Sequence, residues 1–578
     1  MSARPRPLAA RTPRAIAAAA IALGACASPP PPPAAPRVAP DRAVAPAAAP
    51  STSILTIVGT SDLHGHMEAL PVLGGYVAAL RAARGPAAVL LVDAGDMFQG
   101  TLESNVNEGA GVVRAYNALA YDAVAIGNHE FDFGPVGPQA TARAAGDDPR
   151  GALRARAGEA KFPFLAASVE DAATGRAPDW TNVRPSAIVV KDGIRVGLIG
   201  VTSEDTPRTT IAANFEGLRV RPLAAAVTEQ AAALRAGGAS VVVLLAHAGG
   251  KCTDLRHPDD ASSCERGEEI MRLLGALPRG TVDAVVAGHT HQGMAHHIDG
   301  VPVVESFSGG KQFGRIDLTV DRAAAKVVAS TLFPPTELHA PATYEGRAIV
   351  ADEAVARAIA PDVERARAKK EEKLGLHLDT KVTRSFDHES PEGNLFADLM
   401  RASHPAADVA IVNGGGLRAD LPAGDLTYGQ LFEAMPFDNR FAVVRLRGRE
   451  LRAIAAANLR ESKGILSWSG VRVVASCKGR ELDVRIERER GRPIGDDDAV
   501  VLVTSDFLAT GGDGSGIPRS AVTLEEALVR DAFEAQLRGR AGGHLRADEP
   551  PTFDRAKPRV KLPADRPVRC GEEAAAPR

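Results

Sequence analysis

The sequence has few aromatic residues, few cysteines and no excess of either charge. Aromatic residues make up 4% of the 578 positions, so a phenylalanine inside a polar motif is informative. Lysine and arginine (68) nearly balance aspartate and glutamate (71), and this net charge of −3 argues against a nucleic-acid polymer as partner. After the N-terminal region, no apolar run has the length of about 20 residues that a transmembrane helix needs. A chain of this length is expected to form two or three domains.

The first 26 residues are typical of an exported bacterial lipoprotein. Four arginines precede a short apolar run from Ala15, and Leu23-Gly24-Ala25-Cys26 resembles a lipobox, in which Cys26 would carry the lipid. An ordinary cleaved signal peptide with an incidental cysteine is the alternative. Residues 27–51 are rich in proline and alanine and are expected to form an extended tether. We therefore expect a protein that is periplasmic and anchored to the outer membrane, or secreted.

The four remaining cysteines are even in number, which permits disulfides in an exported chain. Cys252 and Cys264 close a short polar loop and are a candidate pair, which would leave Cys477 to pair with Cys570. Free buried thiols are the alternative. The sequence has no Cys-x-x-Cys motif, so a structural zinc site is not expected.

Between residues 52 and 335, five apolar segments end on polar residues. Each segment is a near-continuous apolar run, as in strands that are buried on both faces, and amphipathic segments at 105–120, 220–237 and 265–277 predict helices between them. This alternation predicts an α/β domain, in which functional groups gather beyond the carboxyl ends of the strands. The five ends carry Asp62 and His64; Asp93 and Asp96; Asn128 and His129; His247; and His289 and His291.

The side chains at these ends are typical of a metal centre. Carboxylate, imidazole and one amide oxygen, without thiolate, suit Mn, Zn, Co or Fe. About seven ligands are too many for one tetrahedral ion and suit two ions that share a bridging carboxylate. Two ions about 3.5–4 Å apart stabilise both sides of an in-line displacement, so the predicted chemistry is phosphoester hydrolysis.

The motifs DLHGH, GD, GNHEFD, AH and GHTH resemble, in this order, those of the calcineurin-like metallophosphoesterases. With the C-terminal motifs described below, the resemblance narrows to the bacterial periplasmic 5′-nucleotidase, UDP-sugar hydrolase and 2′,3′-cyclic phosphodiesterase family, over residues 52–565. It implies an α/β fold, a calcineurin-like four-layer αββα sandwich at 52–335, joined by a linker helix at 341–375 to an α+β 5′-nucleotidase C-terminal domain at 376–565. The charged second half of that linker suggests a solvent-bridging connector.

The resemblance also implies roles for the residues at the strand ends. His129 would stabilise charge on the phosphoryl group and assist the leaving oxygen, Asp132 would orient its imidazole, and a metal-activated water would attack in line. The histidines outside the pattern are interpreted as solvated loop residues: His66, His257, His296 and His297. The implied ligands are Asp62, His64 and His291 for the first metal, Asp96 as the bridge, and Asn128, His247 and His289 for the second.

The C-terminal half contains ESPEGNLFADLM, IVNGGGLRADLPAG, MPFDNRFAVVRLRG and SDFLATGGDGSG, in the order found in the nucleotidase C-terminal domain. The family carries an arginine just before the GNL motif, where this chain has Phe386, and Arg384 is the nearest arginine. The resemblance implies that Phe437 and Phe507 hold a base between them, that Asp513 binds the ribose, that Asn413 and Arg418 contact phosphate or sugar, and that Asn439 lies at the base edge.

The leading hypothesis is a membrane-tethered dimetal nucleotidase that releases phosphate and closes over its substrate about a hinge near Lys373–Gly375. Alternatives on the same scaffold are a UDP-sugar or dinucleotide pyrophosphatase, a 2′,3′-cyclic phosphodiesterase and a thiosulfohydrolase. A non-catalytic nucleotide-binding lipoprotein is the alternative of another class. The Phe437 and Phe507 pair favours a base over thiosulfate, and the complete ligand set with His129 favours an enzyme. The expected partners are a nucleotide and, through Cys26, a membrane; a monomer is expected.

Overall fold

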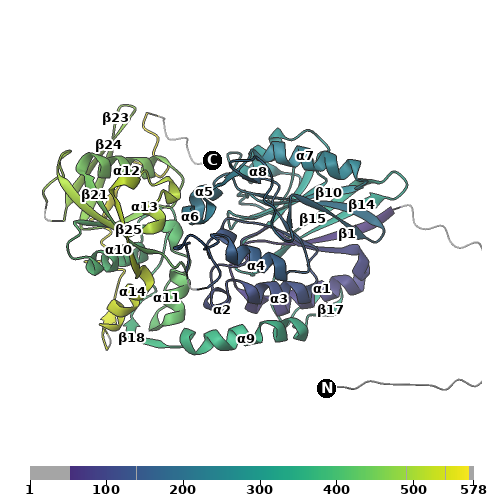
Figure 1. Cartoon of the computed structure of the whole chain (residues 1–578), viewed down its shortest axis with the longest axis horizontal. Helices are drawn as coiled ribbons and strands as arrows, with labels where there is room; N and C mark the ends of the chain where they lie inside the picture. The colour runs from purple at the N-terminus through teal and green to yellow at the C-terminus, as the bar shows by residue number, and fades with distance from the viewer. Residues whose placement is uncertain (1–51, 138, 490, 541, 572–578) are drawn as a thin grey trace, which may run out of the picture. The chain divides into compact units, whose positions relative to one another are not determined.

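The computed structural model describes residues 52–137, 139–489, 491–540 and 542–571 (Figure 1). The signal segment with Cys26 and the tether lie outside the described residues, so the expectations for them stay predictions. The described residues, from Thr52 to Gly571, form one compact unit. Among the described residues, no helix combines the length and apolarity that crossing a membrane requires.

Two mixed sheets form the centre of the N-terminal half, in the orders β15-β14-β1-β2-β3-β4-β6 and β12-β13-β11-β10-β8-β7. The parallel strands of the first are β1 (Thr52–Thr60), β2 (Val89–Asp93), β3 (Ala123–Ala125), β4 (Phe164–Leu165) and β6 (Val183–Arg184), followed at the other edge by antiparallel β14 (Gln312–Asp321) and β15 (Lys326–Glu337). The parallel strands of the second are β8 (Ile194–Thr202), β10 (Val241–His247), β11 (Ala284–Ala287) and β13 (Val301–Ser306), with antiparallel β7 (Ser186–Lys191) and β12 (Gly293–Ile298) at its edges.

The apolar runs of the strands are buried between the two sheets, where Ile57 of β1 and Leu245 of β10 belong to one core cluster. The outer face of the first sheet packs against α1 (Leu70–Arg84) and α3 (Ala110–Leu119). The outer face of the second packs against α7 (Leu223–Ala236) and α8 (Glu269–Ala276), and Figure 1 shows the sheets between these two helix layers. The αββα sandwich and the three predicted helices are therefore confirmed.

The C-terminal half contains a five-stranded sheet with the order β22-β19-β25-β21-β26. One face packs against α10 (Pro391–Ser403), α11 (Tyr428–Ala434) and α14 (Val529–Arg538), and the other against α12 (Gly448–Arg460) and the hairpin β23 (Val471–Lys478) and β24 (Glu481–Arg488). The strands are β19 (Val409–Asn413), β21 (Arg440–Arg447), β22 (Leu466–Ser469), β25 (Ala499–Ser505) and β26 (Val522–Leu528). This arrangement is the expected α+β domain.

The linker differs from the expected single helix over 341–375. A hairpin of β16 (Thr343–Tyr344) and β17 (Arg347–Ala348) comes first, and α9 covers only Glu353–Lys370. The first half of the helix packs through Val355 and Ile359 into the core with α1 and α3. Its charged second half does connect the two halves of the chain, but it is not solvated all round, because Asp362 and Ala366 are buried. Asp362 is fully buried and accepts hydrogen bonds from Arg114 and Asn107. The buried Asp362 carboxylate is tolerated at this position because Arg114 and Asn107 compensate its charge.

Both candidate disulfides form, between Cys252 and Cys264 and between Cys477 and Cys570. The interpretation of His296 and His297 as solvated loop residues is wrong. Both lie in β12, where His296 is fully buried and the His297 ring is within hydrogen-bond distance of Asp259 and Ser330. These residues were predicted to lie in a loop, but they form a strand because β12 pairs with β13 and extends the second sheet.

Replacing Asp362 with alanine should lower the free energy of unfolding by about 1–3 kcal/mol, because the half-buried Asn107 and the Arg114 side chain, which is 43% exposed, lose their acceptor. Urea unfolding measures the effect. The control is Glu364→Ala, whose side chain is 68% exposed on the same helix and should cost less than about 1 kcal/mol. Equal losses for the two variants would show that Asp362 does not anchor α9.

Candidate functional site

The ends of five strands bring the seven predicted ligands together. Donor atoms of Asp62, His64 and His291 lie within 4.8 Å of one another, and so do those of Asp96, His247 and His289. The seventh, Asn128, places Oδ1 3.0 Å from His247 Nε2. Asp96 lies between the two groups, because its Oδ2 is 3.0 Å from His247 Nε2 and 4.0 Å from His64 Nε2.

The imidazole rings are oriented by backbone carbonyl groups. His64 Nδ1 lies 2.8 Å from the Gln99 carbonyl oxygen, and His247 Nδ1 lies 3.0 Å from that of Ala94. A proton on each Nδ1 directs the Nε2 lone pair into the cluster, as metal ligands require. His64 Nε2 lies 2.9 Å from His291 Nε2, so the two ring nitrogens are close enough to share one ion. The donor set therefore fits divalent metal ions.

The protonation of most of these histidines also suits ligands. Burial lowers the pKa of His289 to about 3, and it holds the pKa values of His64 and His291 well below the usual range. These rings are therefore neutral, as metal binding demands. His247 differs: burial opposes its charge, but the Asp96 carboxylate raises its pKa to about 10. If a metal ion replaced that proton, the Asp96 carboxylate would stabilise the positive charge of the ion in the same way.

Five of the seven predicted ligands have positive φ angles, which residues other than glycine adopt rarely. The angles are 51° at Asp62, 48° at His64, 58° at Asp96, 87° at His289 and 59° at His291. Each such residue costs about 1–3 kcal/mol and persists only where the surroundings enforce it. The packing is close enough that a Cβ on Gly127 would lie 2.2 Å from Asp96 Oδ1. The loops are thus strained at the positions that present the ligands.

Two buried glutamates, neither of them predicted from the sequence, hold these loops. Glu130 accepts hydrogen bonds from the backbone N–H groups of Asp96 (2.9 Å), Met97 (2.8 Å) and Gly127 (2.7 Å). Glu305 accepts from the Gly250 N–H (2.9 Å) and from the Thr290 hydroxyl (2.5 Å), beside His289 and His291. The available signal was a charged residue within or next to an apolar strand segment, since such a residue must find buried donors.

His129 and Asp132 lie together beside the ligands. His129 Nδ1 is 2.5 Å from Asp132 Oδ2, and the Thr210 hydroxyl donates to the other carboxylate oxygen at 2.9 Å. His129 Nε2 lies 4.0 Å from Asp96 Oδ2. Burial opposes protonation of His129, but Asp132 and Asp96 outweigh it and raise its pKa. The ring can therefore carry a proton next to the cluster.

Residues of the C-terminal half reach the same place. Arg418 Nη2 lies 3.1 Å from His64 Nε2 and 3.4 Å from His291 Nε2. The Phe437 ring centroid lies 5.6 Å from that of His129. Arg418 and Phe437 are thus next to the predicted ligands, although more than 120 residues separate them from any ligand in the sequence.

The other predicted substrate residues lie in two settings. Asn413 donates to Asp513 at 2.7 Å, so these two form a pair. Phe507 is half-buried against the core near α12, where a Cβ on Gly512 would lie 2.6 Å from its ring. Asn439 is half-buried, and its carbonyl accepts the Val529 N–H at 2.9 Å.

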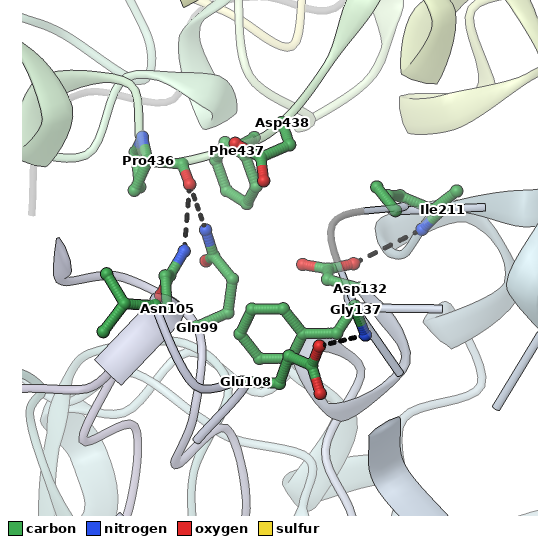
Figure 2. A pocket seen from close by; sticks show the side chains of 12 residues that line it. Gln99, Asn105, Glu108, Asp132, Gly137, Ile211, Pro436, Phe437 and Asp438 are labelled. Carbon is green, nitrogen blue, oxygen red and sulfur yellow. Dashed lines mark hydrogen bonds between the residues drawn. The ribbon is translucent and has the colours of Figure 1, made fainter. Parts of the chain in front are cut away.

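A cavity of about 390 Å³ lies beside Asp132 and Phe437 (Figure 2). Its walls come from both halves, with Gln99, Asn105 and Asp132 on one side and the segment 436–438 on the other. Gln99 and Asn105 both donate to the Pro436 carbonyl, at 2.9 and 3.2 Å, and these bonds hold the Phe437 segment at the cavity (Figure 2). A volume of this size suits a small-molecule ligand.

Replacing Glu130 with alanine should weaken metal binding by about 10–100-fold, because the three N–H groups that shape the Asp96 loop lose their acceptor. Calorimetric titration with Mn²⁺ measures the affinity, and circular dichroism checks the fold. Glu68→Ala, at an exposed position close to the His64 loop, is the matched control and should bind as the unmodified protein does. Unchanged affinity in Glu130→Ala would contradict the role assigned to this carboxylate.

Comparison with known proteins agrees with this geometry. Residues 55–293 match the family model of the calcineurin-like phosphoesterases, and residues 366–519 match that of the 5′-nucleotidase C-terminal domain. The chain is 26% identical over 505 residues to protein UshA of Yersinia enterocolitica, which covers 80% of this chain and 86% of that protein. It is 25% identical over 512 residues to the 5′-nucleotidase of Vibrio cholerae, and this match covers 81% of this chain and 86% of that protein.

Among solved structures, a 5′-nucleotidase precursor from Thermus thermophilus has the same fold, with a TM-score of 0.71 at 24% identity over 88% of this chain and 99% of that one. The phosphoesterase domain implies divalent metal ions, and the second domain implies a nucleotide substrate. With both domains present in this order, the chain belongs to the 5′-nucleotidase family of calcineurin-like phosphoesterases and is a hydrolase of phosphoric esters of nucleotides.

Proposed function

We propose that the protein is an exported 5′-nucleotidase that uses two divalent metal ions and binds the nucleoside through its C-terminal half. The observation that carries this proposal is the position of Arg418, whose Nη2 lies 3.1 Å from His64 Nε2. A residue of the nucleotidase domain thus stands where a phosphate bound at the metal cluster would need a positive charge. The two halves of the chain contribute to one site.

Ions held there would neutralise phosphoryl charge and activate a water for in-line attack. The proposed ligands are Asp62, His64 and His291 for one ion, Asn128, His247 and His289 for the other, and Asp96 for both. Asn128 contributes a neutral oxygen, which keeps the negative charge of the site low enough to admit a phosphate. Mn, Zn, Co and Fe all accept this donor set.

His129 would hold a proton toward the phosphoryl group and the leaving oxygen. Asp132 accepts from Nδ1 and so directs the other ring nitrogen toward the cluster. The Thr210 hydroxyl fixes Asp132 in turn. Arg418 would form charge-assisted hydrogen bonds with the phosphate, for which the planar guanidinium is well suited.

The nucleoside would lie between the halves. Phe437 and Phe507 would stack on the base, Asn439 would contact its edge, and Asp513, held by Asn413, would accept hydrogen bonds from the ribose. The cavity of about 390 Å³ that Phe437 lines is large enough for part of such a ligand, although Phe507, Asn439 and Asp513 are not among its lining residues. We further propose that the halves rotate about the segment near Lys373–Gly375, where Gly375 has a φ of 78°, and that a lipid on Cys26 tethers the protein.

A second candidate activity is UDP-sugar or dinucleotide hydrolysis. The Phe386 side chain is 43% exposed, and its ring lies 3.6 Å from the place of a Cβ on Gly415, next to Asn413. An aromatic side chain there, in place of an arginine, favours a substrate with an uncharged group near the phosphate. Arg384 would compensate for that arginine if the substrate is a simple monophosphate.

The variant His129→Ala should lower kcat by about 10²–10⁴-fold, because it removes the proton donor beside the phosphoryl group. Phosphate release from AMP with Mn²⁺ measures the rate, and elemental analysis checks that the metal content is unchanged. His66→Ala, an exposed histidine near the same loops, is the control. A rate within threefold (roughly RT in free energy) of that of the unmodified protein would exclude His129 from the chemistry.

Alanine at Phe437 or Phe507 should raise KM for AMP by about tenfold or more, because each stacked base is worth about 1–3 kcal/mol. Turnover of p-nitrophenyl phosphate should not change. AMP, ATP, UDP-glucose and 2′,3′-cyclic AMP complete the panel, and Phe333→Ala, a half-buried residue of β15, is the control. Similar turnover of all substrates, insensitive to both phenylalanines, would mean that the second half does not bind a base.

A further inference from the structure

A second group of metal-binding side chains lies on a small sheet of the C-terminal half. This sheet has the order β20-β18-β27, with β18 (Lys373–Leu378) between β20 (Gly424–Thr427) and β27 (His544–Leu545). His377 of β18 stands directly opposite Asp425 on one neighbour and His544 on the other. Asp379 follows His377 by two positions, and side chains two apart in a strand share a face. Four potential ligands therefore lie on one face.

The side chains are close enough to share one ion. Donor atoms of His377, Asp379 and His544 lie within 4.8 Å of one another. His544 Nδ1 is 2.6 Å from Asp379 Oδ1, and His377 Nδ1 is 2.9 Å from Asp425 Oδ1. The two imidazole centroids are 5.0 Å apart. Bonds of about 2.1 Å to a tetrahedral zinc separate its ligands by about 3.4 Å, so small rotations of these side chains suffice.

The backbone beneath the cluster is fixed and the side chains above it are accessible. The His377 N–H donates to the Gly543 carbonyl at 3.1 Å, and the Asp379 N–H donates to that of Leu545 at 3.2 Å. The side chains of His377 and His544 are 43% and 69% exposed. An ion can therefore enter from solvent without any opening of the fold. Lys373 Nζ holds the other oxygen of Asp425 at 2.9 Å and leaves Oδ1 facing His377.

We propose that His377, Asp379 and His544, with Asp425 as the fourth ligand, bind one transition-metal ion of the zinc class. Two imidazoles with carboxylates suit Zn²⁺, Co²⁺ or Ni²⁺ and disfavour Mg²⁺ and Ca²⁺, which take oxygen ligands. All four ligands come from the C-terminal half, so this site is separate from the predicted catalytic ligands, which are all N-terminal to residue 292. The ion would join β27, a strand of two residues, to β18, the strand that follows α9.

The test compares zinc binding in the full chain and in His377→Asn/His544→Asn. Each protein is equilibrated with Zn²⁺ in the presence of excess Mn²⁺ and passed over a desalting column, and bound zinc is measured by elemental analysis. The unmodified protein should retain one more zinc per chain than the double variant. His257→Asn, which removes an exposed histidine elsewhere, should retain as much as the unmodified protein.

A single variant and a second measurement make the test independent of total metal content. Asp379→Asn should weaken the additional zinc site at least about tenfold in a calorimetric titration, with an unchanged number of other sites. Phosphate release with Mn²⁺ should be the same in all these variants, so failure of this site and failure of the proposed catalytic site give different results. Equal zinc content in the double variant and the unmodified protein, or an unchanged titration of Asp379→Asn, would overturn the proposal.

Discussion

The buried carboxylate of Asp96 is the group on which the site depends. It is 1% exposed, its Oδ1 accepts the His129 N–H at 2.8 Å, and its Oδ2 lies 3.0 Å from His247 Nε2. Burial would favour its neutral form, but the surrounding histidines hold its pKa well below the usual range. A buried negative charge is tolerated only with compensating positive charge nearby. His247, His129, Arg418 and the predicted metal ions are the groups that can provide it.

The backbone around Asp96 is bound as firmly as its side chain. Its N–H donates to Glu130, and its carbonyl accepts the His64 N–H at 3.0 Å. The loops after β1, β2 and β3 therefore constrain one another through one residue. This mutual constraint explains how Asp62, His64 and Asp96 can keep positive φ angles, since none of these loops can relax alone. The positions of the candidate ligands therefore depend on the hydrogen bonds between these loops and not on any one loop alone.

Much of this could be predicted from the sequence, and the rest could not for identifiable reasons. Strand ends rich in Asp, His and Asn predict the candidate metal ligands, and the structure brings them together because parallel strands place such ends at one edge. The partners of Glu130 and Glu305 cannot be predicted from the sequence: a charged residue beside an apolar segment shows only that buried donors exist, and most of these donors are backbone N–H groups. The two-residue strands before α9 are too short to show a period. The adjacent His296 and His297 obscure the alternation of β12, so the sequence predicts a loop there.

The position of α9 has a consequence for movement between the halves. The helix is held to the N-terminal half by Val355, Ile359 and Asp362, and its last turn reaches the C-terminal core at Ala366. If the halves rotate as proposed, the helix would move as a rigid arm, and the pivot would be confined to Glu371, Glu372 and the first residues of β18, up to Gly375. A short pivot permits rotation but little separation. Substrate would then enter and leave as rotation moves Arg418 and Phe437 toward and away from the candidate metal ligands, while the two halves remain in contact.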